Sequence, residues 1–438
     1  MKRILLLTTG GTIASRLTDE GLAPGLDGAA LSHYLGGLPD SYNLTVRDIL
    51  HLDSSNIQPE EWRLIARSVY GARKDFDGIV VSHGTDTMAY TASVLSYMVR
   101  NIPVPVVLTG AQLPIEHPLT DGLDNLRTAF AMAASGHPGV FLAFDRRVML
   151  GCRAVKTHTT AFGAFDSVNW PLVAQVNGAG LTIREEAIPS VSGPCVLRDK
   201  LCEAVFLIKL TPGLDPEIFD MLLRMHYRGV VIEAFGAGGL HFIRRNLIEK
   251  LHAAAQSGMA VVVCSQCLYE SSNFSLYQAG QKALAEGVIQ GYDMTTEGAV
   301  TKLMWALGQT EDLDEVVRRA DVLSLHCVLT AETRKLIDAR RLALMKPTAI
   351  LINCARGPMV DEEALIGALE RGELAAAGLD VTDPEPLAPD SPLFRMDNVI
   401  VTPHYAPATL EASIRVSRIG CENILAVLSG QEPAGRIV

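Results

Sequence analysis

The sequence has no long apolar run and few basic residues. No stretch reaches the roughly 20 apolar residues that cross a bilayer. The basic start is followed by only four apolar residues, Ile4 to Leu7, too few for the core of a signal peptide. The 38 Lys and Arg are outnumbered by 49 Asp and Glu, which gives a net charge of −11. Nucleic acids and anionic membranes bind basic faces, so we expect neither as a partner and predict a cytoplasmic protein.

Cysteine is sparse, and its spacing does not indicate a metal site. Eight cysteines are scattered through apolar surroundings, as expected of buried, reduced thiols. Cys264 and Cys267 have C-x-x-C spacing, but no second pair follows at a zinc-site distance. We therefore interpret both as core cysteines at a strand end and expect no metal.

The chain of 438 residues, with 48% hydrophobic residues, is long enough for two or three domains with sizeable cores. A linker rich in Pro, Ser and Gly lies at 183–200, and a new βα pattern starts near Glu311. We therefore expect domains at 1–182, 200–310 and 313–438.

Apolar strands alternate with periodic helices in the first two domains, which is typical of a doubly wound α/β fold. The expected strands are Arg3–Leu7, Thr45–Leu50, Gly78–Ser82, Pro105–Leu108 and Gly139–Phe144, then Ala204–Leu210, Gly229–Ala234 and Ala260–Ser265. A polar loop, Arg16–Gly28, is long enough to act as a lid. In such folds, ligands bind beyond the carboxyl ends of the strands.

Hydroxyl, carboxylate and amine groups stand where these strands end. Thr12 follows the first strand after two glycines, and His83, Thr85 and Asp86 follow the Gly78–Ser82 strand. With Ser54, Ala111 and Lys156, we expect them to gather at one rim. The alternatives are that Thr85 and Asp86 only cap a helix and that Lys156 is a solvated surface residue.

These groups suit acyl transfer on a small amide or ester. A threonine hydroxyl is a weak nucleophile until a neighbour takes its proton, which a lysine amine can do. Backbone N–H groups in glycine-rich turns can stabilise an oxyanion.

Two motifs carry a resemblance to a known family. Thr9-Gly10-Gly11-Thr12-Ile13-Ala14 and His83-Gly84-Thr85-Asp86-Thr87-Met88 resemble the signature motifs of the bacterial-type L-asparaginases, and the likeness covers roughly Met1 to Thr310. It implies an N-terminal catalytic domain and a C-terminal domain. It also implies hydrolysis of asparagine, with glutamine as a second candidate substrate, through a threonine acyl-enzyme. No cofactor is implied, and the assembly would be a homodimer or homotetramer.

The resemblance also assigns roles to residues. Thr12 would be the nucleophile, and a second catalytic triad would consist of Thr85, Asp86 and Lys156. The substrate-binding residues would be Gly11, Ser54, Ser55, Ala111 and again Asp86. Two positions depart from the family: Leu22 stands near a common lid tyrosine, and Gly239 stands where some members have an asparagine that reaches a partner's site.

A different resemblance covers the chain from about Leu313. Asn353-Cys-Ala-Arg356-Gly357, Gly378-Leu-Asp380-Val, Glu385-Pro386 and Thr402-Pro403-His404 resemble the D-isomer-specific 2-hydroxyacid dehydrogenases. The likeness implies that Arg356 binds a substrate carboxylate, Glu385 and His404 form an acid–base pair, and Asp380 touches the nicotinamide of NAD.

This segment predicts only half of a Rossmann-like parallel βαβ sheet, joined to the first family within Glu311–Arg319. It has no Gly-x-Gly-x-x-Gly turn, so we expect no productive NAD binding and no catalysis. Half a sheet leaves an open edge and an uncovered apolar face, so we expect it to fold loosely or to pack against a copy of itself.

Three other functions remain open at this point. One is an NAD-dependent dehydrogenase half completed by a separate chain. The second is a non-catalytic module that binds amino acids. The third is a component of a transfer-RNA-dependent amidotransferase, although no added basic domain favours it.

Overall fold

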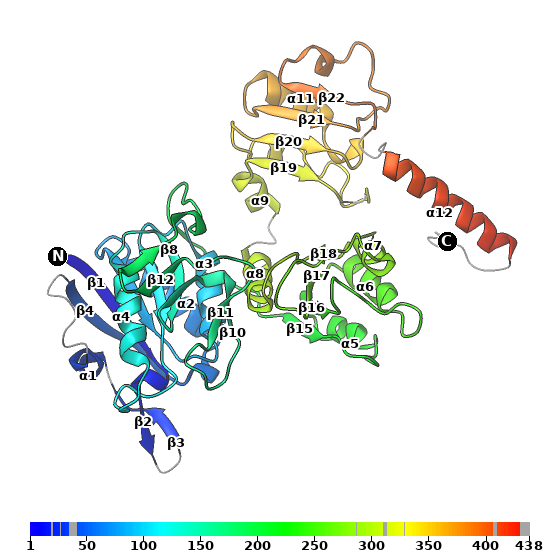
Figure 1. Cartoon of the computed structure of the whole chain (residues 1–438). Helices are drawn as coiled ribbons and strands as arrows, with labels where there is room; N and C mark the ends of the chain where they lie inside the picture. The colour runs from blue at the N-terminus through cyan, green and yellow to red at the C-terminus, as the bar shows by residue number, and fades with distance from the viewer. Residues whose placement is uncertain are drawn as a thin grey trace. The chain divides into compact units, whose positions relative to one another are not determined.

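The computed structural model describes residues 1–18, 21–26, 28–34, 42–285, 287–309, 313–327, 329–405 and 410–429 (Figure 1). The chain divides into two compact units, Met1–Gln309 and Thr310–Val438. Among the described residues, no helix is both long and apolar enough to cross a membrane. The domain border expected between residues 182 and 200 stays a prediction.

The first unit is built on an eight-stranded sheet of order β13-β12-β9-β8-β7-β5-β1-β4. Its strands are β1 (Lys2–Gly10), β4 (Tyr42–Leu52), β5 (Gly78–Ser82), β7 (Pro105–Thr109), β8 (Gly139–Phe144), β9 (Arg147–Leu150), β12 (Ala174–Asn177) and β13 (Gly180–Ile183). The strands from β4 to β8 are parallel, and the other three extend the sheet antiparallel. Every residue of β5 and β7 is buried, which explains their unbroken apolar sequence.

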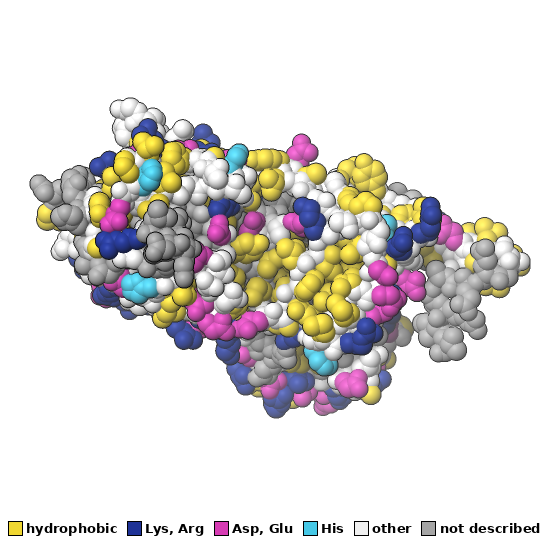
Figure 2. Space-filling model, turned by 90° about the horizontal axis from the view of Figure 1, so that it is seen from below, with side chains coloured by type: hydrophobic (Ala, Val, Ile, Leu, Met, Phe, Trp, Pro, Cys, Tyr) yellow, Lys and Arg dark blue, Asp and Glu magenta, His cyan; other side chains and the backbone are white. Residues whose placement is uncertain are grey.

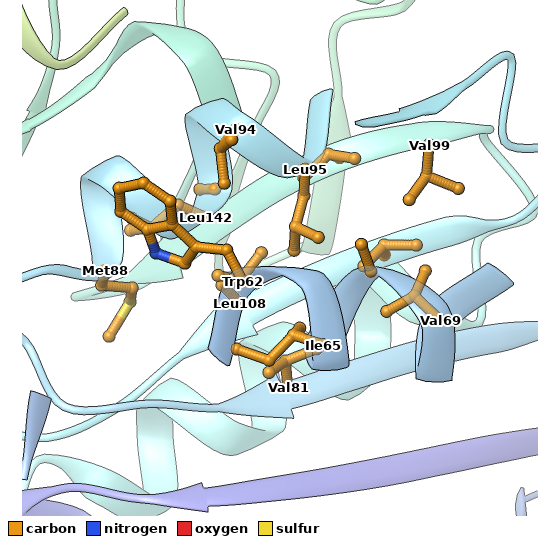
Figure 3. Close-up of a cluster of buried hydrophobic side chains, with 14 of the residues drawn as sticks. Trp62, Ile65, Val69, Val81, Met88, Val94, Leu95, Val99, Leu108 and Leu142 are labelled. Carbon is orange, nitrogen blue, oxygen red and sulfur yellow. The ribbon is translucent and has the colours of Figure 1, made fainter. Parts of the chain in front are cut away.

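Helices cover both faces of this sheet, as the doubly wound pattern predicts. One core lies under α2 (Pro59–Ala72) and α3 (Met88–Met98), and the other under α4 (Gly122–Ala133) and the short α1 (Gly28–His33). Figure 3 shows the first core, where side chains of α2 and α3 meet those of the central strands. Each fully buried Leu or Ile there contributes roughly 1.5–3 kcal/mol.

The segment Arg16–Gly28 is not the plain loop that its polar sequence predicts. It contains an antiparallel hairpin of β2 (Ser15–Thr18) and β3 (Gly21–Pro24), with Ser15 opposite Pro24. Both strands are short and form a two-stranded sheet in the described part of the chain. Their sequences, SRLT and GLAP, lack the apolar alternation by which a strand is recognised.

A smaller parallel sheet follows, formed by β15 (Val205–Lys209), β16 (Gly229–Ala234), β17 (Ala260–Ser265) and β18 (Ile289–Gln290). One face packs on α5 (Ile218–Arg224), α6 (Leu247–Gln256) and α7 (Gln278–Ala285). The other face packs on α8 (Thr296–Gln309). This helix also contacts the larger sheet's α3, where the Ser93 and Thr301 hydroxyls are 2.8 Å apart. Two further pairs of short strands complete the unit: β6 (Val99–Arg100) with β14 (Val196–Leu197), and β10 (Ala154–Lys156) with β11 (Phe165–Ser167).

The second unit holds a four-stranded parallel sheet of order β19-β20-β21-β22. Its elements are α9 (Leu313–Arg319), β19 (Val322–Leu325), α10 (Ala339–Leu342), β20 (Ile350–Asn353), α11 (Glu362–Glu370), β21 (Ala376–Leu379), β22 (Val399–Val401) and α12 (Leu410–Leu428). One face of the sheet packs into its own hydrophobic core. On the sheet, Val322 and Ile400 are 56% and 71% exposed, so the uncovered apolar face expected of a half sheet is present.

Candidate active site

The loops after β1 and β5 touch through two glycines. Thr8, Ser82 and Thr109 lie side by side in register, so the chain leaves β1, β5 and β7 at one edge of the sheet. Gly11 has a φ of 79°, and a Cβ at this position would lie 2.3 Å from the backbone nitrogen of Gly84. Only glycine fits there. Thr12 and Thr85, each next to one of these glycines, are therefore held at the same rim.

The loop after β4 joins the same rim. A Cβ on Gly84 would lie 2.6 Å from Ser54 Oγ, and this oxygen accepts a hydrogen bond from the Asp86 N–H at 3.2 Å. The Thr87 hydroxyl donates to the Ser54 carbonyl at 2.7 Å. The backbone of the β5–α3 turn is thus fastened to a buried Ser54.

Ser55 is fixed differently from its neighbour. Its side chain is exposed, and both its N–H and its hydroxyl donate to Asp53, at 2.8 and 2.6 Å. These hydrogen bonds hold the pKa of the Asp53 carboxyl below its usual value. Asp53 thereby caps the short 3-10 helix Ser54–Asn56.

Lys156 reaches the rim from the end of β10. Its Nζ donates to Thr85 Oγ1 at 2.8 Å and lies 2.6 Å from Asp86 Oδ1. The lysine side chain is only 18% exposed, whereas that of Asp86 is 63% exposed. Lys156 is thus not the solvated surface lysine of the alternative interpretation. Thr85 and Asp86 do not cap α3 either, since its N-cap residue is Thr87.

Ala111 and Ile13, the residue after Thr12, both lie close to Gly122 at the start of α4. Thr12 opens a 3-10 helix (Thr12–Ala14) and is half-buried, while Ala111 is fully buried. A Cβ on Gly122 would lie 3.2 Å from Ile13 and 3.3 Å from Ala111. The structure therefore brings Gly11, Thr12, Ser54, Thr85, Asp86, Ala111 and Lys156 to one edge of the sheet.

His83 is part of the core and not of the reactive cluster. Its ring is fully buried, with Nδ1 2.7 Å from the Gly84 carbonyl and Nε2 2.9 Å from the Thr91 hydroxyl. The Trp62 indole N–H donates to that same hydroxyl at 3.0 Å. Burial lowers the pKa of His83 to about 4, so the ring is neutral at pH 7. Nδ1 then carries the hydrogen, since the Gly84 carbonyl can only accept.

Gln112 belongs to the rim, although the sequence reasoning gave it no role. Its side-chain oxygen accepts a hydrogen bond from Thr85 Oγ1 at 3.4 Å. Its backbone N–H donates to both carboxylate oxygens of Asp121 at 3.0 Å. The sequence clue is its place in Thr109-Gly110-Ala111-Gln112, which follows a strand end and resembles the L-asparaginases.

The expectation of buried cysteines was wrong for half of them. Cys264 is buried, and burial raises the pKa of its thiol to about 12, but Cys267 is exposed. Cys327, Cys354 and Cys421 are exposed as well, because two of them follow strand ends and one lies on α12. Within the described ranges, no cluster of His, Cys, Asp and Glu could hold a metal.

The two departures from the family pattern, Leu22 and Gly239, lie in different parts of the first unit. Leu22 lies in β3, and its side chain is outside the described residues. Gly239 donates its N–H to the Phe235 carbonyl within the second sheet's loops.

In the second unit, the expected acid–base pair is in contact. His404 Nδ1 lies 2.6 Å from Glu385 Oε1. The Thr402 hydroxyl and the Tyr405 N–H donate to Asp380 Oδ1, at 2.5 and 2.7 Å. A pocket of about 460 Å³ joins them, lined by Asp380, Thr382, Glu385, Pro386, Leu387, Phe394, Val401, Thr402, Pro403 and His404.

Arg356 does not join this group. It is exposed, and its guanidinium donates to the carbonyl of the preceding residue, Ala355, at 2.7 Å.

The residues present do not fit a whole dinucleotide. Groups for the nicotinamide end are in place, but this unit has no glycine-rich turn in its sequence to hold a pyrophosphate. We therefore derive no hydride transfer at this pocket.

The comparisons with known families match three stretches of the chain. "Asparaginase, N-terminal" matches residues 3–189, and "Glutaminase/Asparaginase C-terminal domain" matches 204–319. "D-isomer specific 2-hydroxyacid dehydrogenase, NAD binding domain" matches 283–406. The second and third matches share residues 283 to 319, which contain the expected junction.

Several curated relatives resemble the first unit. The L-asparaginase of Thermococcus kodakarensis is 44% identical over 316 residues, which cover 72% of this chain and 95% of the relative. L-asparaginase 1 of Escherichia coli is 32% identical and covers 76% of this chain and 99% of its own length. One component of the glutamyl-tRNA(Gln) amidotransferase of Pyrococcus abyssi is 35% identical, over 72% of this chain and 74% of its own length.

Solved structures give the same likeness. The thermostable L-asparaginase from Thermococcus kodakarensis matches with a TM-score of 0.67 at 44% identity, over 72% of this chain and 95% of that one. L-asparaginase I from Vibrio cholerae matches with a TM-score of 0.64 at 32% identity, over the same shares. Both resemblances stated from the sequence, and the predicted fold class, are confirmed. The chain belongs to the asparaginase family and carries, after that region, part of a D-isomer-specific 2-hydroxyacid dehydrogenase NAD-binding domain.

Proposed function

We propose that the first unit hydrolyses L-asparagine to L-aspartate and ammonia through an acyl-enzyme on Thr12. The observation that carries this proposal is the contact of Lys156 with both Thr85 and Asp86, at the rim to which Thr12 also belongs. The 44% identity to an L-asparaginase supports the choice of substrate.

The reaction has two half-steps. Thr12 Oγ attacks the side-chain carbonyl carbon of asparagine, the C–N bond breaks, and the amide nitrogen leaves as ammonia with the hydroxyl proton. A water molecule then attacks the ester and gives a proton through Thr85 to Lys156. The C–O bond to Thr12 breaks, this proton returns to Thr12 Oγ, and aspartate is released. The backbone N–H groups of the glycine-rich turns stabilise the oxyanion in both steps.

The remaining rim residues bind the substrate. Ser54 holds the α-carboxylate, with Ser55 nearby, and the exposed carboxylate of Asp86 pairs with the α-amino group. Gly11 and Ala111 lie against the side-chain amide. Pocket volume decides between asparagine and glutamine, and glutamine is the second candidate substrate.

Ammonia release from asparagine and from glutamine tests the proposal. We expect Thr12→Ala to lower kcat by several orders of magnitude, because the acyl-enzyme loses its oxygen. Calorimetric titration of Thr12→Ala with asparagine shows whether the site is still formed. Native protein that binds asparagine without releasing ammonia would instead be a non-catalytic amino-acid-binding module.

For the second unit we propose no catalytic role. Its pocket has the Glu385–His404 pair, but the sequence offers nothing that would hold the cofactor's pyrophosphate. Titration with NAD, followed by intrinsic fluorescence, should give no saturable change. Saturable binding would support a dehydrogenase half completed by another chain.

Assembly and location are also proposals. We infer a homodimer or homotetramer of cytoplasmic protein, with sites at the contact between subunits, as the family resemblance implies. On the face drawn in Figure 2, Lys and Arg are distributed among acidic and apolar side chains. Light scattering on the eluted protein measures the assembly, and a monomer that is fully active would contradict it.

A further inference from the structure

Both the backbone and the side chain of Gln112 are held by hydrogen bonds, and the side chain lies beside Thr85. Its side-chain nitrogen donates to the carbonyls of Thr159 and Ala161, at 3.0 and 3.1 Å, in the loop that follows Lys156. Only the NH₂ end of an amide can donate to two carbonyls, so the oxygen end is turned to Thr85. The Gln112 backbone is anchored separately by Asp121.

The hydrogen bonds at the Thr85 hydroxyl indicate what the Gln112 side-chain oxygen does. A charged Lys156 donates to Thr85 Oγ1 at 2.8 Å, so the hydroxyl hydrogen has to point elsewhere. The Gln112 oxygen, 3.4 Å away, is the acceptor for it. When Lys156 is neutral, its lone pair accepts the hydroxyl hydrogen, and Thr85 turns from Gln112 to Lys156.

The charged groups around Lys156 leave this arrangement intact. Asp86 is its direct partner. Titratable side chains on neighbouring elements include Asp166, Arg147, Cys152, Arg153, His158, Tyr90 and Tyr97. Asp166 is paired with Arg147 at 3.0 Å, and burial raises the pKa of both tyrosines, which stay uncharged.

We propose that Gln112 is a positioning residue. Its side-chain oxygen accepts a hydrogen bond from the Thr85 hydroxyl while Lys156 is charged, and this hydrogen bond breaks when Lys156 becomes the base. The same side chain ties the loop after Lys156 to the β7 strand end. This proposal rests on the proposed hydrolase function only for its effect on turnover. The hydrogen-bond switch itself is measurable without substrate.

The test uses two substitutions with opposite expectations. Gln112→Met removes the acceptor and disfavours charged Lys156, so the amine should lose its proton at lower pH. Gln112→Glu keeps the shape and adds a negative charge near the amine, so the proton should be lost at higher pH. The two substitutions should therefore move this proton loss in opposite directions. Gln256→Met, on an exposed part of α6, is the control.

The first readout is the pH dependence of Lys156 acetylation by acetic anhydride in the full chain, followed by mass spectrometry. The second is the acid limb of kcat for asparagine, which should move in the same direction as the labelling midpoint. We also expect kcat to fall roughly tenfold in both variants with little change in KM.

If the labelling midpoint shifts in the same direction in both variants, or in neither, the proposed role of Gln112 is wrong. Loosened packing alone would not shift the midpoint in opposite directions for methionine and glutamate. A native protein that releases no ammonia would defeat the proposed function, yet the labelling midpoints would still decide the switch.

Discussion

The Nζ of Lys156 lies 2.8 Å from the Thr85 hydroxyl oxygen, although 71 positions separate the two residues in the chain. Thr85 is 5% exposed, and the lysine side chain 18%. A lysine withdrawn from water beside a hydroxyl and a carboxylate is placed to exchange a proton with that hydroxyl.

Replacing this amine should abolish turnover. We expect Lys156→Met to lower kcat by about a thousandfold or more, because Thr85 then has no base and the ester is not hydrolysed. Steady-state ammonia release measures the effect. Lys74→Met, at an exposed position on the same unit, is the control and should retain native activity. Activity within tenfold of native in the Lys156 variant would exclude the amine from the reaction.

The contact between Gly11 and Gly84 should tolerate no side chain. Gly11→Ala places a methyl group 2.3 Å from a backbone nitrogen and should lower kcat/KM at least about a hundredfold by separating the Thr12 and Thr85 loops. Gly136 offers a matched control, with a φ of 83° but open space around its Cβ. Gly136→Ala should cost about 1 kcal/mol of stability and leave kcat/KM unchanged. Equal losses from both substitutions would point to backbone strain instead of the contact.

His83 should make the first unit sensitive to acid. Its pKa is about 4 when folded and near 6.5 when unfolded, so between these values the unfolded chain binds the proton and the folded protein does not. The free energy of unfolding should therefore fall as the pH drops from about 6.5 to 4, by up to about 3 kcal/mol. Urea unfolding at a series of pH values measures the slope.

Two variants check that this slope belongs to His83. His83→Leu should flatten it, although it also removes the hydrogen bonds to Gly84 and Thr91. His51→Gln, at an exposed position, should keep the native slope. A His83→Leu slope equal to that of native protein would assign the acid sensitivity to other groups.

The second unit should be the first part of the chain to be degraded. The face of the sheet that includes Val322 and Ile400 is exposed to water, so burial of these side chains does not stabilise this unit. Limited proteolysis of the full chain should cleave near Glu311 and destroy the tail while the first unit survives. A tail that resists the protease as long as the first unit does would show that the half sheet is stably folded or covered by a second copy.

Much of the fold could be predicted from the sequence because the central strands are buried on both faces. Runs such as Ile79–Val81 are continuously apolar, and polar or glycine residues end them abruptly. The expected Gly229–Ala234 and Ala260–Ser265 strands have these same limits in the structure. Short or exposed elements were missed, as the Ser15–Pro24 hairpin shows, since their pairing leaves little trace in residue type.

The residue order alone specifies which chemical groups the protein has and where the chain turns, because glycines, hydroxyls and apolar periodicity are local signals. Which of these groups meet depends on the packing of the sheet. The parallel order β7-β5-β1-β4 places four loops, far apart in sequence, at one edge, and there Lys156 contacts Thr85, whose hydroxyl hydrogen Gln112 can accept. The same packing turned His83 into the core, where burial in a low-dielectric interior keeps it neutral.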